Sequence, residues 1–561
     1  MAKPQRRIYI ETPSGTKTHP FSLKEAQRYE DLIAPYEAEF DGQVVLAQCG
    51  SQLHELGELV EGDPTSIHFL DTAHTDGHRV YMRSLSFVFI LAINRHFPKA
   101  RAIIEHSISG GSYCTIRQGE ERLPLDSNTR DLIEQSMRSI IEADLPIERK
   151  ELSLEEARQF FLEIGRPDKE RSIRYLSADH VSIYKLGQYY DSFYGFMVPS
   201  TRYVSTFHLE LFERGLVLMG PERAQRGVKR NFVPQYKLLE SYQEAERWST
   251  LQKIENTFDL NVLIASGQVG ELVRMTESLQ QHRIMEIAQE IRRQRKRLIL
   301  VAAPSSSGKT SFAYKLKNDL RVLGLRPISL SLDDYYVDRL KTPLDADGAY
   351  DFESLYAIDL ERFEQDMEAL LAGQEVEVIR YDFLSGKRCL TGKTIRLKEG
   401  DPIIIEGIHG LNPKLFRRRE AQDSFKIYLS VTTQINLDDH NRVHTTDLRL
   451  MRRMARDQAF RGKDIRETIA EWPRVRRGEK EHIFPYQEEA DVLFNSSFVY
   501  EIAVLKPLIE GPLQAIPPED ESFLEARRLL ALLKYFLPMT DQSDIVNTSI
   551  LREFIGGSKI V

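Results

Sequence analysis

The stretch from Ala303 to Ser311, with three consecutive serines and a Gly-Lys-Thr sequence near its end, carries the clearest chemical signal in this 561-residue chain. Gly308 allows the backbone to approach an anion closely, Lys309 can reach the terminal phosphates of a nucleotide, and the Thr310 hydroxyl can coordinate Mg²⁺. Apolar residues precede the stretch and helix-forming residues follow it, so the free N–H groups of a helix N-terminus point at the same place. We therefore predict that the loop binds the phosphates of ATP through Ser305, Ser306, Ser307, Gly308, Lys309, Thr310 and Ser311.

The first position of this loop departs from the usual motif. The motif has glycine there, and this chain has Ala303, whose methyl group removes easy access to positive φ. The alternative interpretation is a serine-rich turn that binds nothing. The order of strand, loop and helix favours the phosphate-binding interpretation.

Two further predicted strands are followed by acidic residues. Ile328–Leu332 is followed by Asp333 and Asp334, and Ile403–Ile405 is followed by Glu406. In an open α/β sheet, ligands bind beyond the carboxyl ends of the strands, so these acids should face the phosphate loop. Carboxylate and hydroxyl oxygens are hard ligands of the kind that Mg²⁺ prefers. We predict a Mg²⁺ site formed by Thr310, Asp333 and Glu406.

Transfer of a phosphoryl group to an alcohol also needs a group that accepts the hydroxyl proton. An aspartate at the end of the second strand is well placed for this role. Asp333 is the candidate, and Asp334 remains the alternative because the sequence does not say which side chain turns inward.

The fold class follows from the alternation of strand-like and helix-like segments between residues 298 and 500. Such alternation predicts a parallel sheet with helices on both faces, the P-loop NTPase arrangement, within a multidomain α/β chain. We expect five parts with boundaries at 1–70, 71–230, 231–297, 298–500 and 501–561. The last part, with apolar residues at helical spacing, should pack on the sheet domain or on a second subunit.

Several motifs in residues 298–495 resemble, in the same order, the uridine kinases of the phosphoribulokinase/uridine kinase family. The stretch Leu332–Tyr336 resembles the segment with the catalytic aspartate, which implies that Asp333 is the base and Tyr336 contacts the nucleoside. The stretch Tyr350–Phe352 resembles the segment whose aspartate holds the ribose hydroxyls, and Arg380–Phe383 the segment whose tyrosine lines the nucleoside pocket. The resemblance therefore implies substrate-binding roles for Asp351 and Tyr381.

An arginine-rich segment, Arg452–Asp457 followed by Arg461–Asp464, resembles the family's lid over the phosphates. The resemblance implies that Arg456 and Arg461 neutralise charge on the transferring group, beside Lys309. Arg453 and Lys463 would then lie nearer the nucleoside. Closing cations over a site excludes water and stabilises the transition state. An exposed basic helix face is the alternative interpretation.

Two positions depart from the uridine kinase pattern. Gly386 stands where the family has a base-reading histidine, and Glu471 stands where it has a glutamine on the lid helix. Losing a group that hydrogen-bonds the base weakens or redirects substrate choice. The sequence therefore supports phosphoryl transfer better than it supports uridine as the acceptor.

The first 230 residues resemble two modules of threonyl-tRNA synthetases. Val44–Leu70 resembles the β-grasp TGS module, which implies contact with RNA or regulation, and a purely structural appendage is the alternative. The next part, an expected α+β domain, resembles the one that carries a metal-binding His-x-x-x-His helix. The two ligand positions fall on Arg83 and Phe87, which cannot bind zinc, so we expect the editing chemistry to be lost.

Three other features of residues 1–297 each allow two interpretations. His74 and His78 could share a helix face and a metal, but Asp76–Gly77 between them favours a turn. The aromatic residues between Tyr184 and Thr201 form either core or a surface that stacks on bases. The basic run Arg292–Arg297 is either a solvated helix end or an RNA contact.

Composition limits the class of protein. A net charge of -8 gives no overall electrostatic footprint for nucleic acid, and three distant cysteines suggest neither disulfides nor zinc. No apolar run is long enough to span a bilayer, so we expect a cytoplasmic protein without membrane partners. We also expect a homo-oligomer. With the resemblance added, we expect ATP- and Mg²⁺-dependent phosphorylation of the 5′-hydroxyl of a nucleoside, uridine- or cytidine-like. The alternatives are another small sugar-bearing alcohol as acceptor, or an RNA-binding regulator in which residues 1–297 bind RNA and the P-loop domain is a nucleotide switch.

Overall fold

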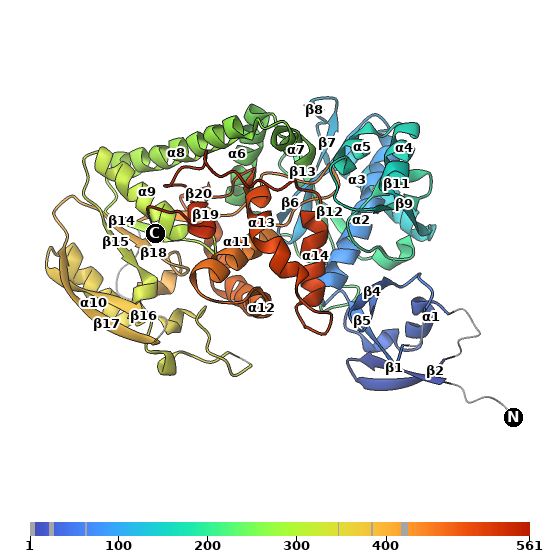
Figure 1. The fold of residues 1–561 in the computed structure, drawn as a ribbon, viewed down its shortest axis with the longest axis horizontal. Helices are drawn as coiled ribbons and strands as arrows, with labels where there is room; N and C mark the ends of the chain where they lie inside the picture. Colours follow the sequence, from blue (N-terminus) through green and yellow to red (C-terminus); the bar gives the residue numbers. More distant parts are fainter. Residues whose placement is uncertain are drawn as a thin grey trace.

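The computed structural model shows a chain whose N-terminal sheet lies at one end and whose hairpin β16–β17, with helix α10, lies at the other (Figure 1). Phe383, part of a motif singled out above, falls outside the described residues. The structure describes residues 6–21, 27–61, 64–345, 347–382, 385–416 and 424–560.

A five-stranded sheet of order β2-β1-β5-β3-β4 forms the N-terminal end. Strands β1 and β5 pair in parallel, and the other neighbours are antiparallel. Helix α1 covers one face, where Ile8, Leu32 and Phe69 share a buried core. The elements are β1 (Arg6–Thr12), β2 (Gly15–Phe21), α1 (Tyr29–Ile33), β3 (Val44–Cys49), β4 (Gln52–Glu55) and β5 (Ser66–Asp71).

The next part wraps two antiparallel sheets, β12-β13-β7-β6 and β11-β10-β9, around the long helix α2. Most of α2 is buried, from Val80 to Ile93, because it packs between these sheets and helix α3. The elements are α2 (Thr75–His96), β6 (Arg101–Ile108), β7 (Gly111–Gln118), β8 (Glu121–Arg122), α3 (Ser127–Glu142), β9 (Ile147–Ser153), α4 (Leu154–Glu163), α5 (Pro167–Ile173), β10 (His180–Leu186), β11 (Tyr189–Ser192), β12 (His208–Phe212) and β13 (Gly215–Met219).

Arg83 and Phe87, which stand at the two metal-ligand positions of the resemblance, both pack against other side chains in the interior of this part. Arg83 donates to the carbonyl of Phe196 at 2.8 Å, and its guanidinium lies over the ring of Tyr194. The Phe87 ring packs edge-on against Phe193, with 5.2 Å between ring centroids. Aromatic side chains from this cluster therefore pack in the core.

The expected turn at Asp76–Gly77 is wrong, because helix α2 already begins at Thr75. His74 caps the helix by accepting from the Asp76 backbone N–H, and burial lowers the pKa of His78 to about 3. Among the residues that the structure describes, no group of three or more His, Cys, Asp or Glu side chains is arranged to hold a metal ion.

Three helices connect this part to the second half: α6 (Tyr236–Gln252), α7 (Thr257–Ala265) and α8 (Val269–Gln294). The basic run begins in the last turn of α8, where Arg293 is 73% exposed and pairs with Glu290. This is the geometry of a solvated helix end. Within the described parts of the chain, none of the helices combines the length and hydrophobicity that a bilayer crossing demands.

The second half is built on a five-stranded sheet of order β15-β18-β14-β19-β20 in which every pair is parallel. Successive residues of β14 face opposite cores: Ile299 lies in one cluster and Leu300 in another. Both faces are therefore covered, and the predicted parallel sheet is confirmed. Its strands are β14 (Leu298–Ala302), β15 (Ile328–Ser331), β18 (Ile403–Glu406), β19 (Ser424–Ser430) and β20 (Val492–Asn495).

Around this sheet lie the helices that follow its strands, and a hairpin that extends away from it (Figure 1). A short 3₁₀ turn, η3 (Leu332–Tyr335), continues β15. The other elements are α9 (Lys309–Val322), α10 (Leu360–Leu371), β16 (Glu375–Asp382), β17 (Lys387–Arg396), α11 (Thr445–Phe460), α12 (Ile465–His482), α13 (Glu501–Gln514), α14 (Phe523–Leu533) and α15 (Arg552–Ile555).

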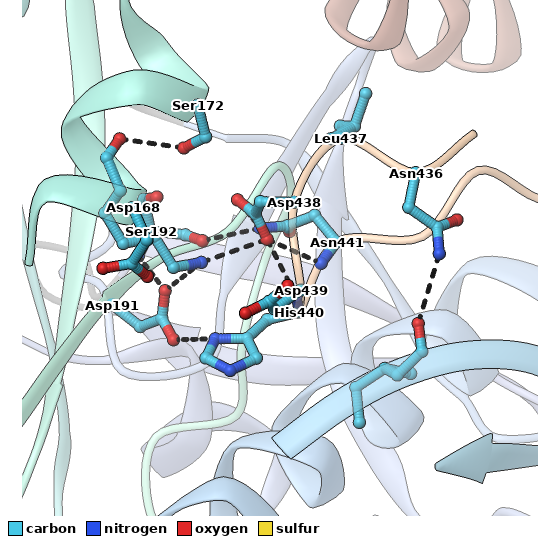
Figure 2. Close-up of polar contacts among 12 residues, drawn as sticks. Asp168, Ser172, Asp191, Ser192, Asn436, Leu437, Asp438, Asp439, His440 and Asn441 are labelled. Carbon is cyan, nitrogen blue, oxygen red and sulfur yellow. Dashed lines mark hydrogen bonds and ion pairs between the residues drawn. The ribbon is translucent and has the colours of Figure 1, made fainter. Parts of the chain in front are cut away.

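A buried polar network joins the two halves of the chain (Figure 2). Lys169 of α5, with no exposed surface, lies 2.5 Å from Asp191 and 3.1 Å from Asp438. His440 Nδ1 contacts the other oxygen of Asp191 at 2.5 Å, and Asn441 donates to the Ser192 carbonyl. Burial opposes ionisation of Asp191, but the Lys169 ammonium and His440 outweigh it and hold the pKa of Asp191 below its usual range.

Replacing Lys169 by alanine leaves two buried carboxylates without their shared cation. We expect Lys169→Ala to lower the free energy of unfolding by about 3 to 5 kcal/mol in urea denaturation. Lys185→Ala, which removes a partly exposed lysine paired with Glu148 at 3.2 Å, is the matched control and should cost about 1 kcal/mol or less. Equal effects of the two substitutions would refute the importance of the network.

Candidate active site

The phosphate loop connects β14 to α9 through two residues with left-handed backbone. Ser306 has φ 61° and Gly308 has φ 81°. Ala303 is fully buried in the core and is not among the described residues with positive φ, so its methyl group causes no backbone strain. The departure from glycine at this position is thus compatible with the loop.

Thr310 and Glu406 meet beside this loop. The Thr310 hydroxyl donates to Glu406 Oε1 at 3.4 Å. Strand register places Glu406 between Val301 of β14 and Ser331 of β15, and Asp333 follows two residues later. The structure therefore brings the three predicted Mg²⁺ ligands to one edge of the sheet.

The surroundings of Glu406 change the pKa of its carboxyl group. Burial, followed by the negative charge of Asp333, raises the pKa of Glu406 to about 7, and Lys309 opposes this shift. Among the described residues, Lys309 has no ion pair within 4.0 Å, although its charge acts on Glu406 and Glu353. An unpaired ammonium beside partly protonated acids is an arrangement that suits an incoming phosphate and its cation.

The two candidate bases occupy different environments. Asp333 acts electrostatically on Glu406, Glu353 and Arg461. Asp334 instead accepts from the backbone N–H of Tyr381 at 3.4 Å, and its pKa is raised by burial. Asp333 is therefore the aspartate whose charge reaches Glu406, the acid that contacts Thr310.

The predicted lid cations gather around one acid, Asp457, which is 1% exposed. Arg456 donates to it at 2.8 Å, and the Arg453 and Arg461 guanidinium groups lie 3.3 and 3.6 Å away. Arg453 also donates to Ser305 Oγ at 3.0 Å, which ties the lid helix to the phosphate loop. Lys463 pairs with Glu471 and makes no described contact with the loop.

Two buried ion pairs, which the sequence reasoning missed, fix the loop backbone from helix α11. Arg449 donates to the Ser305 carbonyl at 3.0 Å and pairs with Glu479 at 3.0 Å. Arg452 lies within 3.5 Å of the Ser306 carbonyl and pairs with Glu501 at 2.8 Å. The arginines of α11 at positions 449, 452, 453 and 456 gave no sign in the sequence of which side chains turn inward.

Aromatic side chains line the side of the site next to η3. The Tyr336 and Tyr381 rings pack edge-on with 5.6 Å between centroids, and the Tyr336 hydroxyl donates to the Phe352 carbonyl. Asp351 Oδ1 accepts from the backbone N–H of Glu353 at 3.1 Å and so caps its own turn. The structure thus brings Tyr336 and Tyr381 together, and places Asp351 in a local turn beside them.

Comparison with known proteins agrees with this geometry. The model of the phosphoribulokinase/uridine kinase family matches residues 298–503. A uridine kinase of Chloroflexus aurantiacus is 31% identical over 223 residues, which are 39% of this chain and 97% of that kinase. The chain belongs to the phosphoribulokinase/uridine kinase family. The part that carries this membership contains the whole of the site described above.

Other proteins resemble parts of the chain. A threonine–tRNA ligase of Syntrophomonas wolfei is 33% identical over 196 residues, which are 35% of this chain and 30% of the ligase. A solved structure, described as that of a possible uridine kinase from Bacillus stearothermophilus, is 20% identical, with a TM-score of 0.25 over 36% of this chain and 89% of that one. A family kinase part and a ligase-like part therefore occur in one chain.

Within the family domain, Glu353 is the acid that sequence reasoning missed. Its Oε2 atom is buried without a hydrogen-bond partner. Burial, followed by the charge of Glu479, raises the pKa of Glu353 to about 7, although Arg453 and Lys309 oppose the shift. The sequence held a signal, because Glu353 directly follows the motif Tyr350–Phe352. The resemblance, however, assigned the substrate-binding role in that segment to Asp351.

The structure shows the surroundings of Gly386 and Glu471, the two positions that depart from the uridine kinase pattern. At Gly386, with φ 67°, a Cβ atom would lie 2.8 Å from the side chain of Arg339. Arg339 thus occupies the space that a side chain at position 386 would need. Glu471 contacts both Arg453, at 3.5 Å, and Lys463, so it neutralises two cations that the resemblance assigned to the substrate.

The raised pKa of Glu353 makes stability depend on pH. A carboxyl whose pKa is higher in the folded state than in the unfolded state binds its proton more tightly when folded, so stability falls as the pH rises from 5 to about 7. In the wild type, Glu353 should lower the free energy of unfolding by about 2 to 3 kcal/mol between pH 5 and pH 8. Glu353→Gln has no such carboxyl, so urea denaturation of this variant should not show that decrease. Exposed Glu361→Gln on α10 is the control, and parallel profiles for wild type and Glu353→Gln would contradict the assignment.

Proposed function

We propose that the family domain transfers the γ-phosphoryl group of ATP to the 5′-hydroxyl of a nucleoside, with uridine and cytidine as the first candidates. The observation that carries the proposal is the convergence of Lys309, Thr310, Asp333 and Glu406 at the carboxyl edge of one parallel sheet. This edge is where open α/β sheets bind their ligands. Membership of the phosphoribulokinase/uridine kinase family supports the same reaction class.

The residues around the loop fit a magnesium-bound nucleotide. Thr310, Asp333 and Glu406 offer hydroxyl and carboxylate oxygens, and Mg²⁺ sites in such enzymes use few protein ligands because phosphates and water complete them. Bound Mg²⁺ would supply charge neutralisation on the phosphates. The loop backbone from Ser305 to Ser311 would hold the phosphates, with Lys309 reaching the terminal ones.

The chain's own groups account for the chemical step. Asp333 accepts the proton of the attacking hydroxyl, because its carboxylate lies near Glu353 and Glu406 and outside any described ion pair. Lys309, with Arg456 and Arg461 of the lid, stabilises the charge that develops on the transferred group. Arg461 is suited to move, since its side chain is 57% exposed.

The acceptor side combines aromatic and polar contacts. Tyr336 and Tyr381 offer a wall for the acceptor, and Asp351 with the neighbouring Glu353 offers carboxylates for sugar hydroxyls. Arg453 and Lys463 are partly neutralised by Glu471, so they are poorer anion sites than two free cations would be. This combination favours a neutral, hydroxyl-rich acceptor over an anionic one.

We propose the same division of the chain as the sequence suggested: TGS-like residues 1–70, synthetase-like residues 71–230 without editing chemistry, a helical linker at 231–297, the kinase at 298–500, and an extension at 501–561. The ligase relative supports a synthetase-like part. RNA contact through residues 1–297 and assembly into a homo-oligomer stay predictions.

The neighbouring aspartates provide the matched test of the function. Asp333→Asn should reduce turnover with ATP and a panel of common nucleosides by roughly 10²- to 10⁴-fold, because it removes the base. The Kd for ATP, measured by calorimetry, should stay within about twofold of wild type. Asp334→Asn should keep turnover within about tenfold of wild type, since its carboxylate serves the Tyr381 backbone. The absence of turnover with every nucleoside in the wild-type enzyme would refute the proposed acceptor class.

A further inference from the structure

The C-terminal helix α15 lies against the phosphate loop, and one of its acids binds the first turn of α9. Glu553 Oε2 accepts from the Ser311 hydroxyl at 2.6 Å and lies 3.4 Å from the Ser311 backbone nitrogen, which donates to it. Ser311 directly follows the Gly-Lys-Thr sequence of the loop. A carboxylate of the chain itself therefore occupies donors of the kind that bind phosphate at a helix N-terminus.

Apolar contacts hold α15 in this position. A Cβ atom on Gly308 would lie 2.3 Å from Ile550 and 3.9 Å from the Phe554 ring, so both side chains lie directly on the loop. Ile550 and Phe554 are almost fully buried. The guanidinium of Arg452 lies 4.8 Å from the centre of the Phe554 ring, which connects α15 to the lid helix as well.

The segment that leads to α15 is fastened independently of Glu553. Arg552 donates to the carbonyls of Gln542 and Ile545, both at 2.8 Å, and so closes the preceding loop upon itself. Lys315 of α9 donates to the Thr548 carbonyl at 3.4 Å. Loss of the Glu553 contact alone would leave these attachments in place.

The carboxylate of Glu553 lies in the neighbourhood of other acids. The carboxylate adds to the negative field at Glu406, where Asp333 already acts. Its compensation comes from the N–H and hydroxyl of Ser311 and from the positive end of the α9 dipole. A nucleotide phosphate would compete for the same donors and bring more negative charge to the same place.

We propose that Glu553 is an intramolecular competitor of the nucleotide: the carboxylate holds the first turn of α9 until ATP displaces it, so that α15 restrains the affinity of the loop for ATP. The proposal rests on the proposed function, because it requires that this loop binds ATP. It assigns to the C-terminal extension a direct effect on the site, beyond the packing role expected from its sequence.

Glu553→Gln tests the proposal in the full-length protein. The variant keeps the size of the side chain and removes its charge, so the Kd for ATP, measured by calorimetry without an acceptor, should fall about tenfold. Glu521→Gln, an exposed glutamate of the same extension, is the matched control and should leave the Kd unchanged. Thermal unfolding of each variant verifies that it is folded.

Hydrogen exchange supplies a second measurement in the wild-type protein. Saturating ATP should reduce the amide protection of residues 553–556, because displacement of Glu553 removes one contact of α15 while the attachments made by Arg552 and Lys315 stay. An unchanged or weaker affinity in Glu553→Gln, or increased protection with ATP, would overturn the proposal and make Glu553 a supporting part of the nucleotide site. Failure of both wild type and Glu553→Gln to bind ATP while folded would overturn the proposed function together with it.

Discussion

Burial of neighbouring carboxylates at the edge of the parallel sheet is the constraint on which the rest of the site depends. Asp333, Glu353, Glu406 and Glu553 all act on a small volume beside the phosphate loop. Burial first, and then the charge of a nearby acid, Glu479 for Glu353 and Asp333 for Glu406, raises the pKa of both groups to about 7. Such a cluster is costly in a low dielectric, so it favours a state in which protons or a cation are present. The ammonium of Lys309, which has no ion pair among the described residues, is part of this balance.

Helix α11 divides its arginines between two tasks. Arg449 and Arg452 are buried, paired with Glu479 and Glu501, and bound to loop carbonyls. The remaining lid arginines share Asp457 near the site. Removing one partner of a buried pair leaves an uncompensated charge, so the first set keeps the loop in one conformation. The second set shares Asp457, with Glu471 as a further partner of Arg453 at 3.5 Å, and such shared pairing suits cations that rearrange around a phosphate.

The N-terminal half is attached immediately before this helix. The segment Asn436–Asn441, four to nine residues ahead of Thr445, is held by Lys169, Asp191 and Ser192 from the N-terminal half. A backbone bond from Ile104 to the Asp439 carbonyl adds a third attachment. Because this segment leads directly into α11, the two halves form a physically connected unit.

Much of this protein was determined by local sequence. The strand-loop-helix order around Gly308, the acids that end β15 and β18, and the alternation that gives a parallel sheet are consequences of short-range patterns, and the structure places Thr310, Asp333 and Glu406 together as those patterns require. These features can be predicted from the sequence because each depends on a few adjacent residues and on the rule that the carboxyl ends of parallel strands lie at the same edge of the sheet.

Tertiary structure alone decided which neighbouring side chains point where. Asp333 and Asp334 are equivalent in sequence, and only the packing of β16 against η3 turns Asp334 towards the Tyr381 backbone. The same is true of Glu353, whose burial depends on α12, and of Glu553, which reaches Ser311 across 242 residues. Long-range contacts of this kind leave no periodic trace in the sequence, because they depend on how separate elements pack rather than on the residues beside them.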